Sequence, residues 1–280
     1  MRRLGYGYAR GNTKGHYMFS TVSEDDIRRN YSKVGTNLIE RLYGGDFLSL
    51  SGVESSDEMI EITGTDDNAR VLDVGCGVGG PSLHLAERTG CHVTGLDLME
   101  WHVEEATSRA LARGLGDQTA FQAGDAAALP FPDASFDVVW SQDAWVHVPD
   151  KAKVISEAAR VLKPSGHIAF TDWVVLDDMP PERSAEIHTA IAAASCATPA
   201  QYEAWLDAAG CSLVQSKDIS SHFAARYQVM MSNLADLEEE ISKQFSPRVF
   251  NVIQEKNMTI LDAFAAGEMG GWQFVAKAAG

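Results

Sequence analysis

A glycine-rich segment, VLDVGCGVGG at residues 71–80, is the part of the sequence that most clearly indicates chemistry. An apolar run ends at Asp73, and three glycines follow at alternate positions: Gly75, Gly77 and Gly79. Glycines at this spacing let the backbone turn tightly and approach a ligand, because no Cβ atom stands in the way. The segment therefore predicts a ligand-binding turn between a strand and a helix.

A dinucleotide is one candidate ligand for this turn. Gly75, Gly77 and Gly80 fit the G-x-G-x-x-G pattern, and Asp97 lies about 20 residues further on, so a nicotinamide-dependent oxidoreductase is one hypothesis. The carboxylate of Asp73 argues against it, since it would face the pyrophosphate of the dinucleotide. A carboxylate at that place suits a cationic ligand instead.

Further polar residues follow the next apolar runs: Asp97 in TGLDL, Asp125 in AGDAAALPFPDASFDVV, and Gln142 in WSQD. Residues of this kind at the carboxyl ends of parallel strands lie where open α/β sheets bind ligands. A carboxylate there can accept hydrogen bonds from both hydroxyls of a ribose. Each acid alone could be a turn or cap residue, but that explanation would have to hold at every position in turn.

In this order of motifs the sequence resembles the class I S-adenosylmethionine-dependent methyltransferases, over residues 65–175. The resemblance implies an enzyme that binds S-adenosylmethionine and methylates a small molecule. A non-catalytic module that binds the same cofactor is a further alternative. The implied cofactor contacts are Asp73 with Gly75, Gly77 and Gly79 near the methionine moiety, Asp97 with Leu98 at the ribose, Asp125 with Ala126 at the adenine, and Gln142 near the amino-acid end.

A second resemblance concerns the methyl acceptor. RLYGGDFLSLSG at residues 41–52 and FSPRVFNVIQEK at residues 245–256 are similar to segments of the sarcosine/dimethylglycine N-methyltransferases, which make glycine betaine. This implies the nitrogen of sarcosine, dimethylglycine or a related amine as acceptor. The core also resembles sugar O-methyltransferases of natural-product pathways, so O- or C-methylation of a specialised metabolite is the alternative.

In the sugar methyltransferases a histidine and an aspartate together form the catalytic base. These two residues map onto His147 and Asp172. Both residues are expected at the carboxyl edge of the sheet, where His147 could take a proton from the acceptor. An ordinary imidazole pKa near ~6.5 predicts activity that rises over the neutral range. Alternatively, His147 only satisfies a hydrogen bond at a strand-to-helix junction. The other histidines are expected to have surface or core roles.

Tyrosines of the first 65 residues are candidates for the substrate wall, because aromatic faces bind methylated ammonium groups; packing is the alternative role. The three candidates are Tyr17, Tyr31 and Tyr43. A substrate carboxylate would need a cationic anchor, for which the sequence offers Arg28, Arg29, Lys33 and Arg226.

Short apolar runs alternate with helical patterns from Arg70 onwards, which predicts a Rossmann-like, doubly wound α/β fold. The expected sheet has seven mostly parallel strands, the last one antiparallel, and its strand order reverses beside the glycine-rich turn. The expected division is an N-terminal cap at residues 1–65 and a methyltransferase domain at residues 66–280, with a helical insertion at about 222–266.

Composition narrows the partners and the compartment. The net charge of −16 disfavours nucleic acid and anionic membranes, so a small molecule is the expected partner; a homo-oligomer stays open. No apolar run approaches the ~20 residues of a membrane span, and no secretory signal follows Met1. The four cysteines lack metal-ligand spacing, so we expect no metal, free thiols and a cytoplasmic location.

Overall fold

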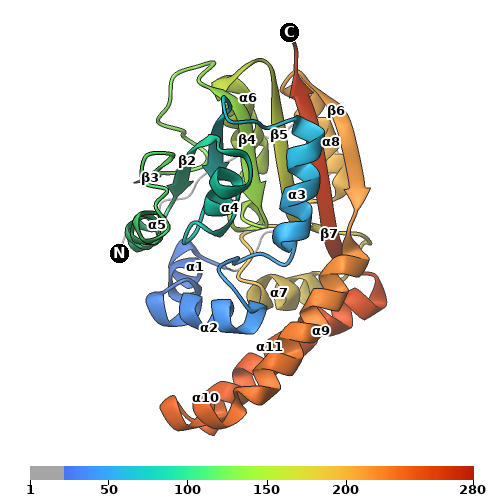
Figure 1. The fold of residues 1–280 in the computed structure, drawn as a ribbon. Coiled ribbons are helices and arrows are strands. Elements are labelled where there is room, and N and C mark those ends of the chain that lie inside the picture. Colours follow the sequence, from blue (N-terminus) through green and yellow to red (C-terminus); the bar gives the residue numbers. More distant parts are fainter. Residues whose placement is uncertain (1–21) are drawn as a thin grey trace, which may run out of the picture.

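The computed structural model describes residues 22–280, and a seven-stranded sheet forms its centre (Figure 1). The strand order is β3-β2-β1-β4-β5-β7-β6, and β7 runs antiparallel to both of its neighbours. The strands are β1 (Arg70–Val74), β2 (His92–Asp97), β3 (Thr119–Ala123), β4 (Phe136–Gln142), β5 (Leu162–Val175), β6 (Cys211–Asp218) and β7 (Met269–Ala278). The fold class, the antiparallel last strand and the reversal beside the glycine-rich turn, between β1 and β4, are thus confirmed.

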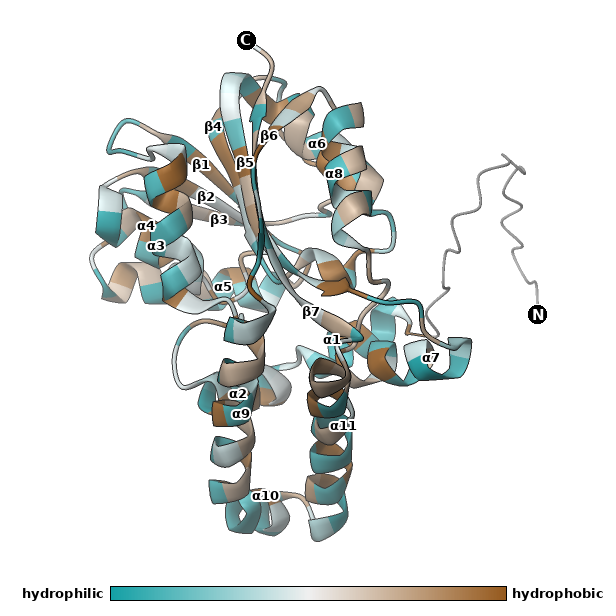
Figure 2. Cartoon of the chain, turned by 90° about the vertical axis from the view of Figure 1, so that its right-hand side faces the viewer, coloured by the Kyte–Doolittle hydropathy of each residue, from teal (hydrophilic) through white to brown (hydrophobic). Residues whose placement is uncertain are grey.

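Helices cover both faces of the sheet (Figure 2). On one face lie α3 (Gly52–Thr63), α4 (Gly80–Thr89) and α5 (Glu100–Ala112); on the other lie α6 (Lys151–Val161) and α8 (Pro199–Ala208). The central strand β1 is buried from Val71 to Val74, and three of these four residues are apolar. Leu83 of α4 and Ile155 of α6 belong to the two apolar cores that these layers form.

A separate group of helices covers the carboxyl edge of the sheet. It includes α1 (Glu24–Asn30), α2 (Lys33–Tyr43) and α7 (Pro181–Ala190), together with the short 3-10 helix η1 (Trp145–His147). α1 begins at a capping box in which Ser23 and Asp26 satisfy each other's backbone amides, and Tyr31 is its C-cap residue. This start and stop place Tyr31 at the sheet edge.

Three helices between β6 and β7 form an arm that projects away from the sheet (Figure 1). They are α9 (Ser220–Asp236), α10 (Glu238–Gln244) and α11 (Pro247–Ala266). α3, which lies in the expected cap at residues 1–65, packs on α4, β5 and β7. Of the described helices before β1, α1 and α2 lie over the carboxyl edge. Within residues 22–280, no helix is both long and apolar enough to cross a bilayer.

Candidate active site

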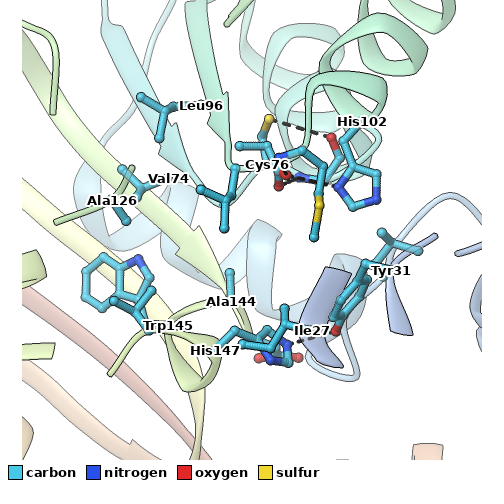
Figure 3. A pocket seen from close by; sticks show the side chains of 18 of the residues that line it. Ile27, Tyr31, Val74, Cys76, Leu96, His102, Ala126, Ala144, Trp145 and His147 are labelled. Atoms are coloured by element: carbon cyan, nitrogen blue, oxygen red, sulfur yellow. Dashed lines mark hydrogen bonds and ion pairs between the residues drawn. The ribbon is translucent and has the colours of Figure 1, made fainter. Parts of the chain in front are cut away.

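A cavity of about 280 Å³ opens at the carboxyl ends of β1, β2 and β4, under α1 (Figure 3). This is the point at which the strand order reverses, and open α/β sheets bind ligands there. Its wall is largely apolar, with Ile27, Leu48, Val74, Leu96 and Trp145 among the lining residues. None of the lysines and arginines that the structure describes lines it.

The glycine-rich turn forms one wall of the cavity through Gly75 and Gly77, which have φ angles of 84° and 53°. A Cβ atom on Gly75 would lie 2.5 Å from the Cβ of Ala144, so only glycine fits this position. Gly79 is the N-cap of α4 and does not line the cavity. The backbone of the turn is thus exposed to a ligand at its first two glycines.

Asp73 lies behind the turn rather than in the cavity. It is almost fully buried, and one carboxylate oxygen accepts the hydroxyl hydrogen of Ser82 in α4 at 2.6 Å. The other oxygen has no partner among the described residues. Burial raises the pKa of Asp73 to about 7. The carboxylate of Asp73 thus joins β1 to α4, and its place near the methionine moiety of a cofactor stays a prediction.

Asp97 holds the neighbouring wall together. Its Oδ2 accepts the amide hydrogen of Gly77 at 2.9 Å, and its Oδ1 accepts that of Met99 at 2.9 Å. His102 Nδ1 lies 3.0 Å from Oδ1, and its Nε2 lies 3.2 Å from the hydroxyl of Thr36 in α2. The carboxylate thus connects the glycine turn, the start of α5 and α2. Leu98, Asp125 and Ala126 line the same part of the cavity.

At the end of β4, the amide group of Gln142 is fully engaged. It accepts the hydroxyl hydrogen of Ser56 at 2.7 Å and donates to Ser51 Oγ and the carbonyl of Gly52, each at 3.0 Å. Gln142 lines the cavity, but its polar atoms attach the start of α3 to the sheet. The contact with a cofactor's amino-acid end that the sequence suggested would have to compete with these bonds.

Asp143, the next residue, also lines the cavity. Its carboxylate accepts the amide hydrogen of Ser51 at 3.0 Å and the hydroxyl hydrogen of Thr171 at 2.7 Å. Its φ angle of 55° lies in the left-handed region, which is uncommon for a residue other than glycine. Burial raises its pKa.

Tyr31 and His147 meet across the cavity (Figure 3). The hydroxyl of Tyr31 lies 2.8 Å from Nε2 of His147, and Nδ1 of His147 lies 2.9 Å from the carbonyl oxygen of Ala192. A carbonyl can only accept, so Nδ1 carries the hydrogen, and Nε2 of the neutral ring accepts the Tyr31 hydroxyl hydrogen. Burial lowers the pKa of His147 to about 4 and raises that of Tyr31, so both groups are neutral at pH ~7.

The expected direct pairing of Asp172 with His147 is wrong. Asp172 is fully buried beneath η1, where one oxygen accepts the amide hydrogen of Val146 at 3.1 Å and the other accepts the hydroxyl hydrogen of Tyr202. Both ring nitrogens of His147 have other partners. Asp172 therefore contacts the backbone of η1, and burial raises its pKa to about 7. The ordinary imidazole pKa expected for His147 is also replaced by the lower value.

The other expected substrate contacts are only partly brought together. Tyr31 lines the cavity, whereas Tyr43 packs in the apolar cluster of α2 and α9, and Tyr17 lies outside the described residues. Arg28 and Arg29 form ion pairs with acids of their own helix, with Glu24 and Asp26. None of the four candidate cationic anchors (Arg28, Arg29, Lys33 and Arg226) lines the cavity.

His102 and Ser49 are among the cavity residues that sequence analysis did not identify. His102 was expected to have a surface or core role, but it contacts Asp97 and lines the cavity. Its position in the first turn of the helix after Asp97 was the available signal. Ser49 is 2% exposed and lines the cavity, and its hydroxyl has no partner among the described residues. Such a buried hydroxyl requires a partner, which a ligand could provide.

Comparison with known proteins agrees with this geometry. A family profile described as a methyltransferase domain matches residues 72–170. The 27-O-demethylrifamycin SV methyltransferase of Amycolatopsis mediterranei (strain S699) is 33% identical over 188 residues, which are 65% of this chain and 68% of that protein. The glycine/sarcosine/dimethylglycine N-methyltransferase of Actinopolyspora halophila is 34% identical over 175 residues, which are 62% of this chain and 31% of that protein.

Among solved structures, a putative sarcosine dimethylglycine methyltransferase from Galdieria sulphuraria superposes with a TM-score of 0.79 at 22% identity. The match covers 87% of this chain and 97% of that one. The shared stretch spans 30 to 68% of the lengths of the curated relatives. The fold is that of the class I methyltransferases. The chain belongs to the S-adenosylmethionine-dependent methyltransferases.

Proposed function

We propose that this enzyme methylates a hydroxyl oxygen of a largely apolar small molecule, with His147 as the general base. One observation supports this proposal above the others: the lone pair of His147 Nε2 is directed at a hydroxyl, that of Tyr31, inside the cavity. An acceptor hydroxyl can take the place of that group or donate to it. A hydroxyl must lose its proton as its oxygen attacks, so a neutral imidazole at this place has a defined task.

The cofactor fits the residues present on two observations. Gly75 and Gly77 line the cavity, and Ser49, which lines it too, has a buried hydroxyl without a partner among the described residues. In this proposal Gly75, Gly77, Asp97, Leu98, Asp125 and Ala126 contact S-adenosylmethionine. Asp73, Gly79 and Gln142 act indirectly by shaping the turn and attaching α3. When bound, the cofactor supplies an electrophilic methyl group on a sulfonium sulfur.

This chain's residues then orient the acceptor and move one proton. Tyr31 stays protonated because burial raises its pKa, so it can donate a hydrogen bond to the acceptor. His147 Nε2 takes the acceptor's proton, while the carbonyl of Ala192 keeps the ring's other hydrogen on Nδ1. The apolar wall of the cavity excludes water from the reacting atoms. The methyl group of S-adenosylmethionine is already activated, so the main contribution of the protein to its transfer is to position the acceptor.

A nitrogen acceptor, which the sequence resemblance favoured, is the second candidate. It is supported by the carboxylate of Asp143 in the cavity and by the aromatic ring of Tyr31, both of which favour a cationic amine. It is also supported by the name of the Actinopolyspora relative. Sarcosine and dimethylglycine carry a carboxylate, however, and no described cationic side chain of the cavity could bind it. The name of the rifamycin relative supports an oxygen acceptor instead.

The net charge and the cysteines bear on the kind of partner and on the cellular location. A net charge of −16 favours a small molecule over nucleic acid as the partner. All four cysteines are free thiols, which supports the proposal of a cytoplasmic enzyme.

The test is incubation with S-adenosylmethionine and two matched panels, one of apolar alcohols and phenols and one of amines that includes sarcosine and dimethylglycine. Mass spectrometry reads the gain of one methyl group. We expect products in the first panel. Products from sarcosine and dimethylglycine alone would contradict the oxygen proposal and favour the second candidate.

A further inference from the structure

Lys151, the first residue of α6, has a buried ammonium group. The residue is 2% exposed, which is rare for lysine because burial of its charge is costly unless the group is well bonded. Nζ donates to the carbonyl of Val148 at 2.9 Å and to the carbonyl and hydroxyl oxygens of Ser195 at 2.8 and 2.6 Å. Its three hydrogens thus join two backbone segments that are distant in the sequence.

One of these segments is the loop between α7 and α8, residues 191–198, which we call the α7–α8 loop. Its residue Ala192 has a φ angle of 54°, in the left-handed region, and its carbonyl oxygen accepts the Nδ1 hydrogen of His147. The amide of Ala194 donates to the carbonyl of Val146 in η1 at 3.1 Å. The loop therefore touches η1 beside the residue proposed as the base.

We propose that Lys151 is a positioning residue: it attaches the α7–α8 loop to the end of η1, and so keeps His147 in the tautomer whose Nε2 can accept a proton. The inference rests on the proposed function of His147 for its catalytic consequence, but the tautomer itself can be measured independently. Neither Lys151 nor Ser195 contacts the cavity.

The positive charge has a physical role in this arrangement. An ammonium group donates three hydrogen bonds from one atom, which no neutral side chain does. The charge of Lys151 acts on the carboxylate of Asp172 on β5, the thiol of Cys196 in the α7–α8 loop, His188 of α7 and His147 of η1. Asp172 in turn accepts the amide hydrogen of Val146. η1 is thus held by Asp172 on one side and by Lys151 on the other.

The experiment compares Lys151→Met with Lys153→Met. Lys153 lies on the same helix, but its side chain is half exposed and pairs with Glu157. Lys153→Met is therefore the control, because it removes one positive charge at a position that does not contact the α7–α8 loop. Ser195→Ala is a milder variant, because it removes one of the three acceptors and leaves both carbonyls. NMR with ¹⁵N-labelled histidine rings reports the tautomer of His147, whose signals are assigned by their absence in His147→Asn.

In the wild type and in Lys153→Met we expect a pyrrole-type Nδ1 and a pyridine-type Nε2. In Lys151→Met the two ¹⁵N shifts should move towards one another, and in Ser195→Ala they should move less. The kcat of Lys151→Met should fall by about 10- to 100-fold, with a smaller change in the KM of the acceptor, since a displaced base costs about that much. A purely structural role would lower the melting temperature without moving the tautomer.

A wild-type tautomer in folded Lys151→Met would overturn the proposal. Should that variant fail to fold, Ser195→Ala decides: wild-type shifts together with wild-type kcat would overturn it too. An altered tautomer with full kcat would support the positioning role of Lys151 and contradict His147 as the base. The failure of the proposed function is therefore distinct from the failure of this inference.

Discussion

The hydroxyl of Tyr31 and Nε2 of His147 lie 2.8 Å apart although 116 positions separate them in the sequence. The contact joins the end of α1 to η1 across the cavity, and it places both side chains next to the glycine turn. It also removes His147 from water, which is the main reason that its pKa falls to about 4.

The pH dependence of turnover follows from this burial. The base is active when neutral, so activity should be lost only as the pH falls through about 4. With a hydroxyl acceptor, we expect kcat to be flat from about pH 5.5 to about pH 8. Initial rates measured at saturating cofactor and acceptor check this. An acidic limb near the ordinary imidazole pKa of ~6.5 would contradict it. With an amine acceptor, a rise at higher pH would report the amine's own pKa.

Asp97→Asn should weaken both the cofactor and the fold. The substitution replaces one accepting oxygen with a donor, so it opposes either the amide of Gly77 or the amide of Met99 together with ring Nδ1 of His102. Loss of a charge-assisted acceptor for the ribose should cost roughly 1.5–3 kcal/mol in the binding of S-adenosylmethionine. Calorimetry and thermal unfolding measure the two effects. Asp117→Asn is the matched control, because Asp117 is exposed and does not line the cavity. Unchanged cofactor affinity in Asp97→Asn would refute the assignment.

Asp73→Asn should stabilise the cofactor-free protein at alkaline pH. The folded-state pKa of Asp73, about 7, lies above the ordinary value of 3.8, so the folded protein binds more protons between these values. Its contribution to the free energy of unfolding therefore falls as the pH rises through that window, by an amount on the order of a few kcal/mol. Urea unfolding of wild type and variant at about pH 5 and about pH 8 tests this.

The variant should gain stability relative to the wild type as the pH rises. Asp117→Asn, at an exposed aspartate, should show no such change. If the free energies of unfolding of Asp73→Asn and wild type differ by the same amount at both pH values, the pKa of Asp73 is not raised in the folded state.

Much of the fold could be predicted from the sequence, because each buried strand is a short apolar run and each turn at the site contains glycine or an acid. The pairing of His147 with Asp172 could not. Both residues do lie at the carboxyl edge, but Asp172 is directed towards Tyr202 of α8, beneath η1. Which way a strand-end side chain points depends on the register of β5 with its neighbours, and this is set by contacts distant in the sequence.

The partner of His147 was equally beyond local patterns. The carbonyl oxygen of Ala192 accepts the Nδ1 hydrogen of His147. Every residue has a backbone carbonyl, so the residue type at position 192 does not indicate this contact. The hydroxyl of Ser49 has no partner among the described residues, and no pattern in the sequence indicates this. His102 is the exception, since its spacing from Asp97 put it in the first helical turn beside a strand-end acid.

The central claim is that His147 takes the proton of the methyl acceptor, and single-turnover methyl transfer by His147→Ala tests it most directly. On the best acceptor found in the panels, with the cofactor saturating, wild type and variant are compared at about pH 7 and about pH 9. For a hydroxyl acceptor we expect a loss of about 10²–10⁴-fold at neutral pH. For an amine the loss should be smaller and should shrink as the pH rises, because solvent then deprotonates the amine before it binds. Full turnover of the variant at both pH values would contradict the account and leave His147 as a residue that only closes the cavity with Tyr31.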